Sequence, residues 1–148
     1  MFFRNVSKVQ GLHIILNLEY LFLSRNKITS ISTLAGLTKL KIVYLTNNQV
    51  TSISELQKMT EIERLELGEN KISDITPLIN NEGISGAINL KNNPLSNTAL
   101  STHIPALEAR GITVEYDMPE GVVLFKDANL EKAISFLTSI LTPPVQTL

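Results

Sequence analysis

Apolar positions recur along this chain with a period of 22 residues, and each unit reads LxxLxLxxNxIxxIxxLxxL. Three apolar columns and one polar column show the repeat most clearly: Leu18, Leu40 and Ile62; Leu21, Val43 and Leu65; Leu23, Leu45 and Leu67; and Asn26, Asn48 and Asn70. The same register extends back to Val6 and forward to Leu78. A match maintained over three units indicates a structural repeat rather than general amphipathicity.

Within each unit, the alternation of side chains predicts a short strand followed by a return segment. In the central unit, Val43 and Leu45 are expected to point inward, while Ile42 and Tyr44 point outward. One such strand cannot bury its apolar side alone, so neighbouring units are expected to stack into a parallel sheet over a shared aliphatic core. The return segment over 53–59 has apolar residues three apart, which predicts a 3₁₀ or α turn on the convex side.

An asparagine follows each predicted strand at the point where the chain turns. Because a sharp turn leaves buried backbone donors and acceptors, we expect these side-chain amides to form a ladder that satisfies the backbone of adjoining units. The expected members are Asn26, Asn48, Asn70 and Asn93. The last unit needs a step of 23 residues, and Gly83 and Gly86 lie on the approach to its strand.

A helical segment and a closing strand are expected at the end of the array. Leu100, Ile104 and Leu107 have helical spacing. Pro105 predicts a break or kink in that segment, and Gly111 is suited to end it. Residues 112–116 alternate between apolar and polar and predict the closing strand.

This pattern resembles leucine-rich repeat proteins, in the short-repeat class that includes the internalins. The resemblance covers roughly residues 6–116, and the run NNPLS…HIPALEARGITVEYD is similar to the end of many bacterial and archaeal members. It implies an α/β leucine-rich repeat solenoid, with a curved parallel sheet on the concave face and short 3₁₀ or α turns on the convex face. It also implies that partners are proteins or peptides, although a fold does not by itself define a function.

The composition changes after the array, which predicts two parts: the repeats over 1–116, and a linker plus amphipathic helix over 117–148. The run FKDANLEKAI resembles the cap helix that begins such arrays, although here it follows one. Two interpretations follow: the chain is a fragment of a longer protein with a second array, or the helix seals the open end of the core. At the other end no cap precedes the first unit. An uncapped strand edge predicts self-association there, or a missing upstream segment.

Charge and composition exclude several kinds of chemistry. The chain has 13 basic and 14 acidic residues, a net charge of −1, which lacks the basic footprint of a nucleic-acid binder. There is no cysteine, and His13 and His103 do not have metal-site spacing. Ser85 does not lie in a GxSxG nucleophile motif. We therefore expect no catalytic residue, no metal and no cofactor, and a protein that is not an enzyme.

Nothing in the sequence predicts insertion into a membrane. The most apolar stretch, over 12–23, contains a histidine, an asparagine and a glutamate and is too short to span a bilayer. The chain begins without a recognisable secretion signal. These features leave two locations open: cytoplasmic if the chain is complete, or extracellular if it is a fragment of a larger protein.

The outward positions of the strands form the candidate binding surface. The candidate contact residues are Tyr20, Phe22, Ile42, Tyr44, Arg64 and Glu66. Exposed aromatic side chains beside an arginine are typical of protein recognition. The alternative is an aromatic ladder across the strands that only supports the sheet. We expect a non-catalytic module that binds a protein or peptide through its concave face. The alternative function is a structural or adhesive segment of a larger surface-exposed repeat protein.

Overall fold

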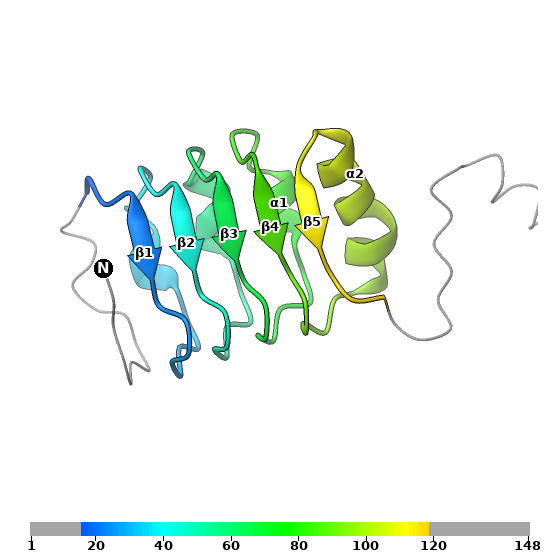
Figure 1. The fold of residues 1–148 in the computed structure, drawn as a ribbon, viewed down its shortest axis with the longest axis horizontal. Helices are drawn as coiled ribbons and strands as arrows, with labels where there is room; N and C mark the ends of the chain where they lie inside the picture. Colours follow the sequence, from blue (N-terminus) through cyan, green and yellow to red (C-terminus); the bar gives the residue numbers. More distant parts are fainter. Residues whose placement is uncertain (1–15, 119–148) are drawn as a thin grey trace, which may run out of the picture.

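In the part of the chain that the structure describes, five short parallel strands lie side by side in sequence order, β1-β2-β3-β4-β5 (Figure 1). The computed structural model describes residues 16–118. The strands are β1 (Tyr20–Phe22), β2 (Ile42–Tyr44), β3 (Arg64–Glu66), β4 (Ala87–Asn89) and β5 (Thr113–Glu115). The predicted solenoid with a parallel sheet is therefore confirmed.

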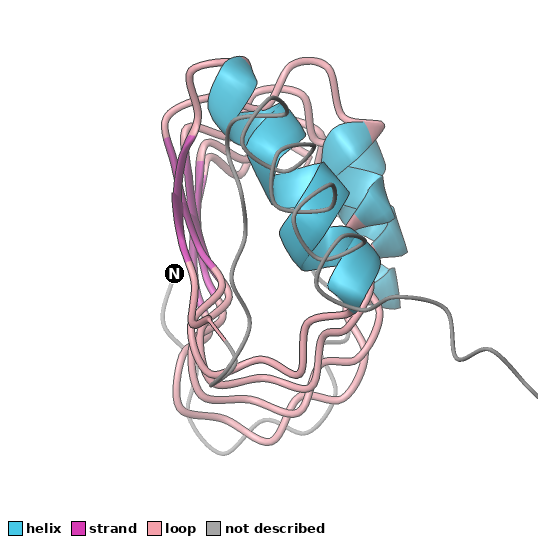
Figure 2. Cartoon of the chain, turned by 90° about the vertical axis from the view of Figure 1, so that its right-hand side faces the viewer, coloured by secondary structure: helices cyan, strands magenta, loops and turns pink. Residues whose placement is uncertain are grey.

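Short helical segments run along the side of the molecule opposite the sheet (Figure 2). Among residues 16–118, two are 3₁₀ turns, two are α-helical and one is a π turn: η2 (Ser32–Leu34), η3 (Ser54–Lys58), α1 (Thr76–Ile79), η4 (Ala99–His103) and α2 (Ile104–Ala109). The predicted turn over 53–59 corresponds to η3. Its apolar positions contact the core because residues three apart fall on one side of a 3₁₀ turn.

The inward apolar columns form one continuous core between the sheet and the helical segments. Val43 and Leu45 are fully buried, whereas Ile42 and Tyr44 are only half-buried. The same alternation holds in β1, where Leu21 is buried. Each unit thus contributes one aliphatic layer, and it is the contact between layers that removes these side chains from water.

Strand register follows the repeat until one extra residue enters before β4. Residues 42 and 64 pair at a step of 22, whereas Arg64 pairs with Ala87 at a step of 23. The extra residue lies between Ile84 and Ile88, where Gly86 has a φ of +70°. A side chain at Gly86 would collide with the carbonyl oxygen of Glu63. Glycine lets the chain bulge here and return to register one residue later.

The expected break at Pro105 is a change from π to α helix rather than an interruption. The backbone N–H of Ile104 donates to the carbonyl of Ala99, five residues back, and α2 begins at that point. Pro105 then occupies the first turn of α2, where a missing N–H costs little. Gly111 follows the helix with a φ of +83°, as expected of a helix stop.

Both ends of the chain carry expectations that lie outside the described residues. The strand edge expected to be uncapped is that of β1, which ends the described sheet, but residues 1–15 before it lie outside the description, so the missing cap and the self-association stay predictions. The predicted amphipathic helix falls within residues 119–148. Within the described part, no helix is long and apolar enough to cross a bilayer.

Candidate functional site

Four asparagines of the described residues fasten the turns that follow strands β1 to β4. The Asn48 amide donates to the carbonyl oxygens of Leu23 and Leu45, both at 2.9 Å, and its side-chain oxygen accepts from the Ile28 N–H at 3.0 Å. The bonds therefore link two adjacent units. Asn70 repeats this arrangement one unit further on. The four side chains are Asn26, Asn48, Asn70 and Asn93, of which the first three are buried and the last is half-buried.

The residue before each of these asparagines has a left-handed backbone conformation. The four residues are Arg25, Asn47, Glu69 and Asn92, with φ between 55° and 59°. This conformation costs a residue with a Cβ roughly 1–2 kcal/mol, so the hydrogen bonds around the turn must offset it. Only the two asparagines of this set belong to a residue type that favours it. The sequence pattern did not identify these positions, because their side chains share no property.

Asn81 is a structural residue that the sequence pattern did not single out. Its side chain is fully buried. The amide nitrogen donates to the carbonyls of Leu56 and Met59, and the side-chain oxygen accepts from the backbone N–H groups of Gly83 and Ile84. Asn81 stands one period after Met59, so a polar residue in an otherwise apolar column was the available signal.

The concave face presents a half-buried aromatic stack on its first two strands. The rings of Phe22 and Tyr44 lie 5.1 Å apart between centroids at an interplanar angle of 27°. This separation is close to the spacing of adjacent strands, because the two residues are register partners. Tyr20 is 47% exposed, and its register partner Ile42 is half-buried. The structure brings these four predicted residues together on one face.

Arg64 and Glu66 continue this surface onto β3. The guanidinium carbon of Arg64 lies 5.9 Å from the centroid of the Tyr44 ring, which is within cation–π range. Its Nε and one terminal nitrogen contact the same Glu66 oxygen at 3.0 and 2.9 Å. The Arg64 side chain is 52% exposed, whereas that of Glu66 is only 13% exposed. The two predicted contact residues therefore differ: Arg64 faces the solvent, and Glu66 lies beneath it.

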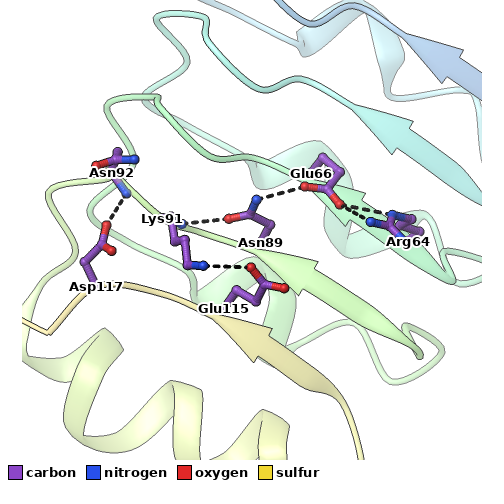
Figure 3. Close-up of polar contacts among 7 residues, drawn as sticks. All are labelled: Arg64, Glu66, Asn89, Lys91, Asn92, Glu115 and Asp117. Carbon is purple, nitrogen blue, oxygen red and sulfur yellow. Dashed lines mark hydrogen bonds and ion pairs between the residues drawn. The ribbon is translucent and has the colours of Figure 1, made fainter.

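A polar network extends from Glu66 to the last strand (Figure 3). The second oxygen of Glu66 accepts from the Asn89 amide at 2.9 Å, and the Asn89 oxygen accepts from the backbone N–H of Lys91 at 3.0 Å. The Lys91 ammonium pairs with Glu115 at 3.0 Å. At the turn beyond, the N–H of Asn92 donates to Asp117. The concave face is thus aromatic over β1–β2 and polar over β3–β5.

Ion pairing raises the pKa of both cations on this polar half. For Arg64 the largest cause is the hydrogen bond to Glu66, followed by the interactions with Tyr44 and with the charge of Glu66. For Lys91 it is the hydrogen bond to Glu115, followed by the charge of that residue. Both groups remain cationic at every physiological pH.

The histidines, the carboxylates and Ser85 are the remaining candidates for metal-binding or catalytic chemistry. Over 16–118, no three histidines or carboxylates lie close enough to hold a metal ion. His103 lies in η4 on the convex side, away from the concave carboxylates, and His13 lies outside the described residues. Ser85 lies in the bulge before β4. None of these positions adds to the candidate surface.

Known proteins share this architecture. A family model described as leucine-rich repeats (two copies) matches residues 16–58 and 43–80. Internalin C2 of Listeria monocytogenes is 32% identical with a TM-score of 0.67, over 76% of this chain and 48% of its own. An internalin (inlF) of the same species is 26% identical with a TM-score of 0.68, over 77% of this chain and 34% of its own. A leucine-rich repeat protein of Leptospira interrogans is 27% identical with a TM-score of 0.56, over 68% and 25% respectively. No curated protein sequence matches the chain.

The chain is therefore a leucine-rich repeat protein of the short, internalin-like class. It spans less than half the length of each of these solved structures. The family and its neighbours support a protein-interaction module in general, and proteins of this class are typically non-catalytic.

Proposed function

We propose that this chain is a non-catalytic binding module that engages a protein or peptide through the concave face of its sheet. The observation that carries the proposal is the stack of Phe22, Tyr44 and Arg64 across three strands, outside the aliphatic core. Tyrosine and arginine supply a large share of binding energy in protein interfaces, because they combine contact area with directed polar groups.

The nature of the core strengthens this proposal. The sheet already buries a complete aliphatic layer in each unit, and its backbone turns are fastened by asparagines. Aromatic side chains on the other face are therefore not needed to fill the core. The competing interpretation, a supporting ladder across the strands, predicts that removing the stack destabilises the fold without any effect specific to binding.

Selection from a random peptide library displayed on phage provides the test. The bait is the full chain, and selected peptides are then measured against two double variants of matched size. In one, Phe22 and Tyr44 on the concave face become serine. In the other, Gln57 and Lys58, both exposed on convex η3, become serine.

We expect peptides that bind the unsubstituted chain to lose at least about tenfold in affinity for the concave variant, which corresponds to about 1.4 kcal/mol. Affinity for the convex variant is expected to stay within about twofold. Equal losses in the two variants, or a loss only in the convex one, would contradict a concave binding face. Circular dichroism of both variants separates lost binding from lost folding.

A second candidate function is a structural or adhesive segment of a larger surface-exposed repeat protein. It is favoured by the greater length of the solved structures that this chain matches. The complete reading frame around this sequence tests it. Further repeats on both sides, together with a concave double variant that leaves adhesion of the whole protein unchanged, would favour this function over direct binding.

A further inference from the structure

The stack on the concave face ends abruptly at Arg64. Phe22, Tyr44 and Arg64 follow one another across β1, β2 and β3. On β4 the register partner of Arg64 is Ala87, whose side chain is a single methyl group. Its own partner on β5 is Thr113, which is also short. At this register position β4 and β5 thus carry only short side chains, whereas Asn89, two residues further along β4, lies on the far side of the Glu66 carboxylate; 52% of the Arg64 side chain is exposed.

Glu66 holds the guanidinium in place and leaves it little need for another counter-ion. One carboxylate oxygen receives two Arg64 nitrogens, and the other receives the Asn89 amide. With 13% of its side chain exposed, Glu66 is itself poorly placed to contact a partner. Its role is to fix a flexible side chain so that less conformational entropy is lost when something packs against it.

Charge complementarity favours a neutral aromatic group over an acidic one at this place. An incoming carboxylate would compete with Glu66 for Arg64 and would be repelled by Glu66. An aromatic ring carries no net charge, and its face is electron-rich, so it is attracted to a guanidinium without displacing Glu66. Tyr44 already makes such a contact from the β2 side.

We propose that Arg64 receives an aromatic side chain of the protein partner in the space above Ala87, which extends the stack by one ring, and that Glu66 is the positioning residue. This inference rests on the proposed function, because it specifies what the partner presents to the concave face. The contact residue is Arg64, and Glu66 acts through it.

NMR titration of the full chain tests the proposal with three small probes. They are N-acetyl-L-tyrosinamide as a neutral aromatic, sodium acetate as an anion and N-acetyl-L-leucinamide as an aliphatic control. The reporter is the Nε–Hε signal of Arg64, assigned by its disappearance in Arg64→Lys, together with the backbone amides of Tyr44 and Ala87.

The aromatic probe is expected to shift these three signals in a saturable way, with at most weak, non-saturating shifts from the other two. In Arg64→Lys, which keeps the charge but loses the flat fork, the affinity read from the backbone amides is expected to fall about two- to fivefold. That factor corresponds to about 0.5–1 kcal/mol for an exposed cation–π contact.

Two further variants separate contact from structure. Ala87→Leu fills the space beside Arg64 and should weaken the aromatic probe severalfold, whereas Thr113→Leu, one strand further away, should not. Glu66→Gln should weaken the aromatic probe, alter the Arg64 Nε–Hε signal before any probe is added, and strengthen acetate binding. A purely structural role for Glu66 would not produce that gain for acetate.

The possible failures are distinguishable. Saturable shifts from acetate but not from the aromatic probe would overturn the inference in favour of an acidic partner, and the proposed concave face would stand. If the aromatic probe shifts only the signals of Tyr20 and Ile42, the role of Arg64 is overturned, but the proposed concave binding face is not. If none of the probes shifts Arg64, the inference fails, and the proposed function is then judged by its own peptide selection.

Discussion

Asn48→Ala is the sharpest test of how the repeats are held together. The Asn48 side chain makes three hydrogen bonds, but the backbone groups that it bonds do not depend on it equally. The carbonyl of Leu23 also accepts from Asn26, and the carbonyl of Leu45 also accepts from Asn70. Truncation therefore leaves both carbonyls with one donor each.

The backbone N–H of Ile28 is the group that loses its acceptor. It donates to the Asn48 side-chain oxygen at 3.0 Å in a buried setting. A buried donor without a partner costs about 1–3 kcal/mol, and the two lost N–H···O bonds add about 0.5–1.5 kcal/mol each. The expected loss is therefore about 2–6 kcal/mol, a large part of the roughly 5–15 kcal/mol that stabilises a typical domain.

Urea unfolding followed by far-ultraviolet circular dichroism measures this loss. With a slope of about 2 kcal/mol per molar urea, the midpoint is expected to fall by about 1–3 M. Gln49→Ala is the matched control, because its side chain is exposed and its backbone bond to Ile28 is kept. If the free energy of unfolding of Asn48→Ala lies within about 0.5 kcal/mol of that of the control, the asparagine ladder does not stabilise the array in this way.

Three further predictions concern other parts of the molecule. Gly86→Ala should destabilise the fold by more than the roughly 1–2 kcal/mol expected from its positive φ alone, because the new methyl group meets a backbone carbonyl. Gly111→Ala, which has a similar φ but open space around the new methyl group, should cost only that amount. Comparing the urea midpoints of the two variants tests this difference. The double variant of Phe22 and Tyr44 to serine should still unfold cooperatively, and a loss of the cooperative transition would place these rings in the core. The pKa of Asp74 is lowered by hydrogen bonds from the hydroxyl and backbone N–H at the start of α1, so its stabilising effect is present above the unfolded-state pKa of about 3.9 and is lost as the pH falls below it. Asp74→Asn should therefore show a smaller drop in urea midpoint between pH 7 and pH 2.5 than the unsubstituted chain, and an equal drop would contradict the assignment.

The repeat register was sufficient to predict the fold because each unit encodes the same packing. Alternation around Val43 and Leu45 placed the strand and its inward side, and the spacing over 53–59 placed the turn on the opposite face. The repeat register does not predict the positions at which one unit departs from the common pattern. Asn81 reverses the polarity of a core column, and Gly86 absorbs an extra residue through a backbone conformation that the pattern does not describe.

The candidate surface was predictable as a set of positions but not as a set of roles. Tyr44 and Arg64 were expected to face outward, and both do. Glu66 also accepts a hydrogen bond from Asn89, which lies 23 residues further along and is its register partner because of the extra residue before β4. Side-chain contacts between adjacent units depend on such details, so aligning the repeats of one sequence does not predict these contacts.

The two sides of each strand have different roles, which explains why the side chains on the concave face can differ from unit to unit. Inward residues fill the core, and the asparagines satisfy the turns, so the fold does not require any particular outward side chain. The aromatic half and the polar half therefore differ without any change in the strands beneath them. Glu66 shows the limit of that freedom, since an outward residue that fixes its neighbour can no longer serve as a contact itself. Substituting outward positions one at a time should thus separate contact residues, which change binding alone, from positioning residues, which change binding together with the Arg64 signal.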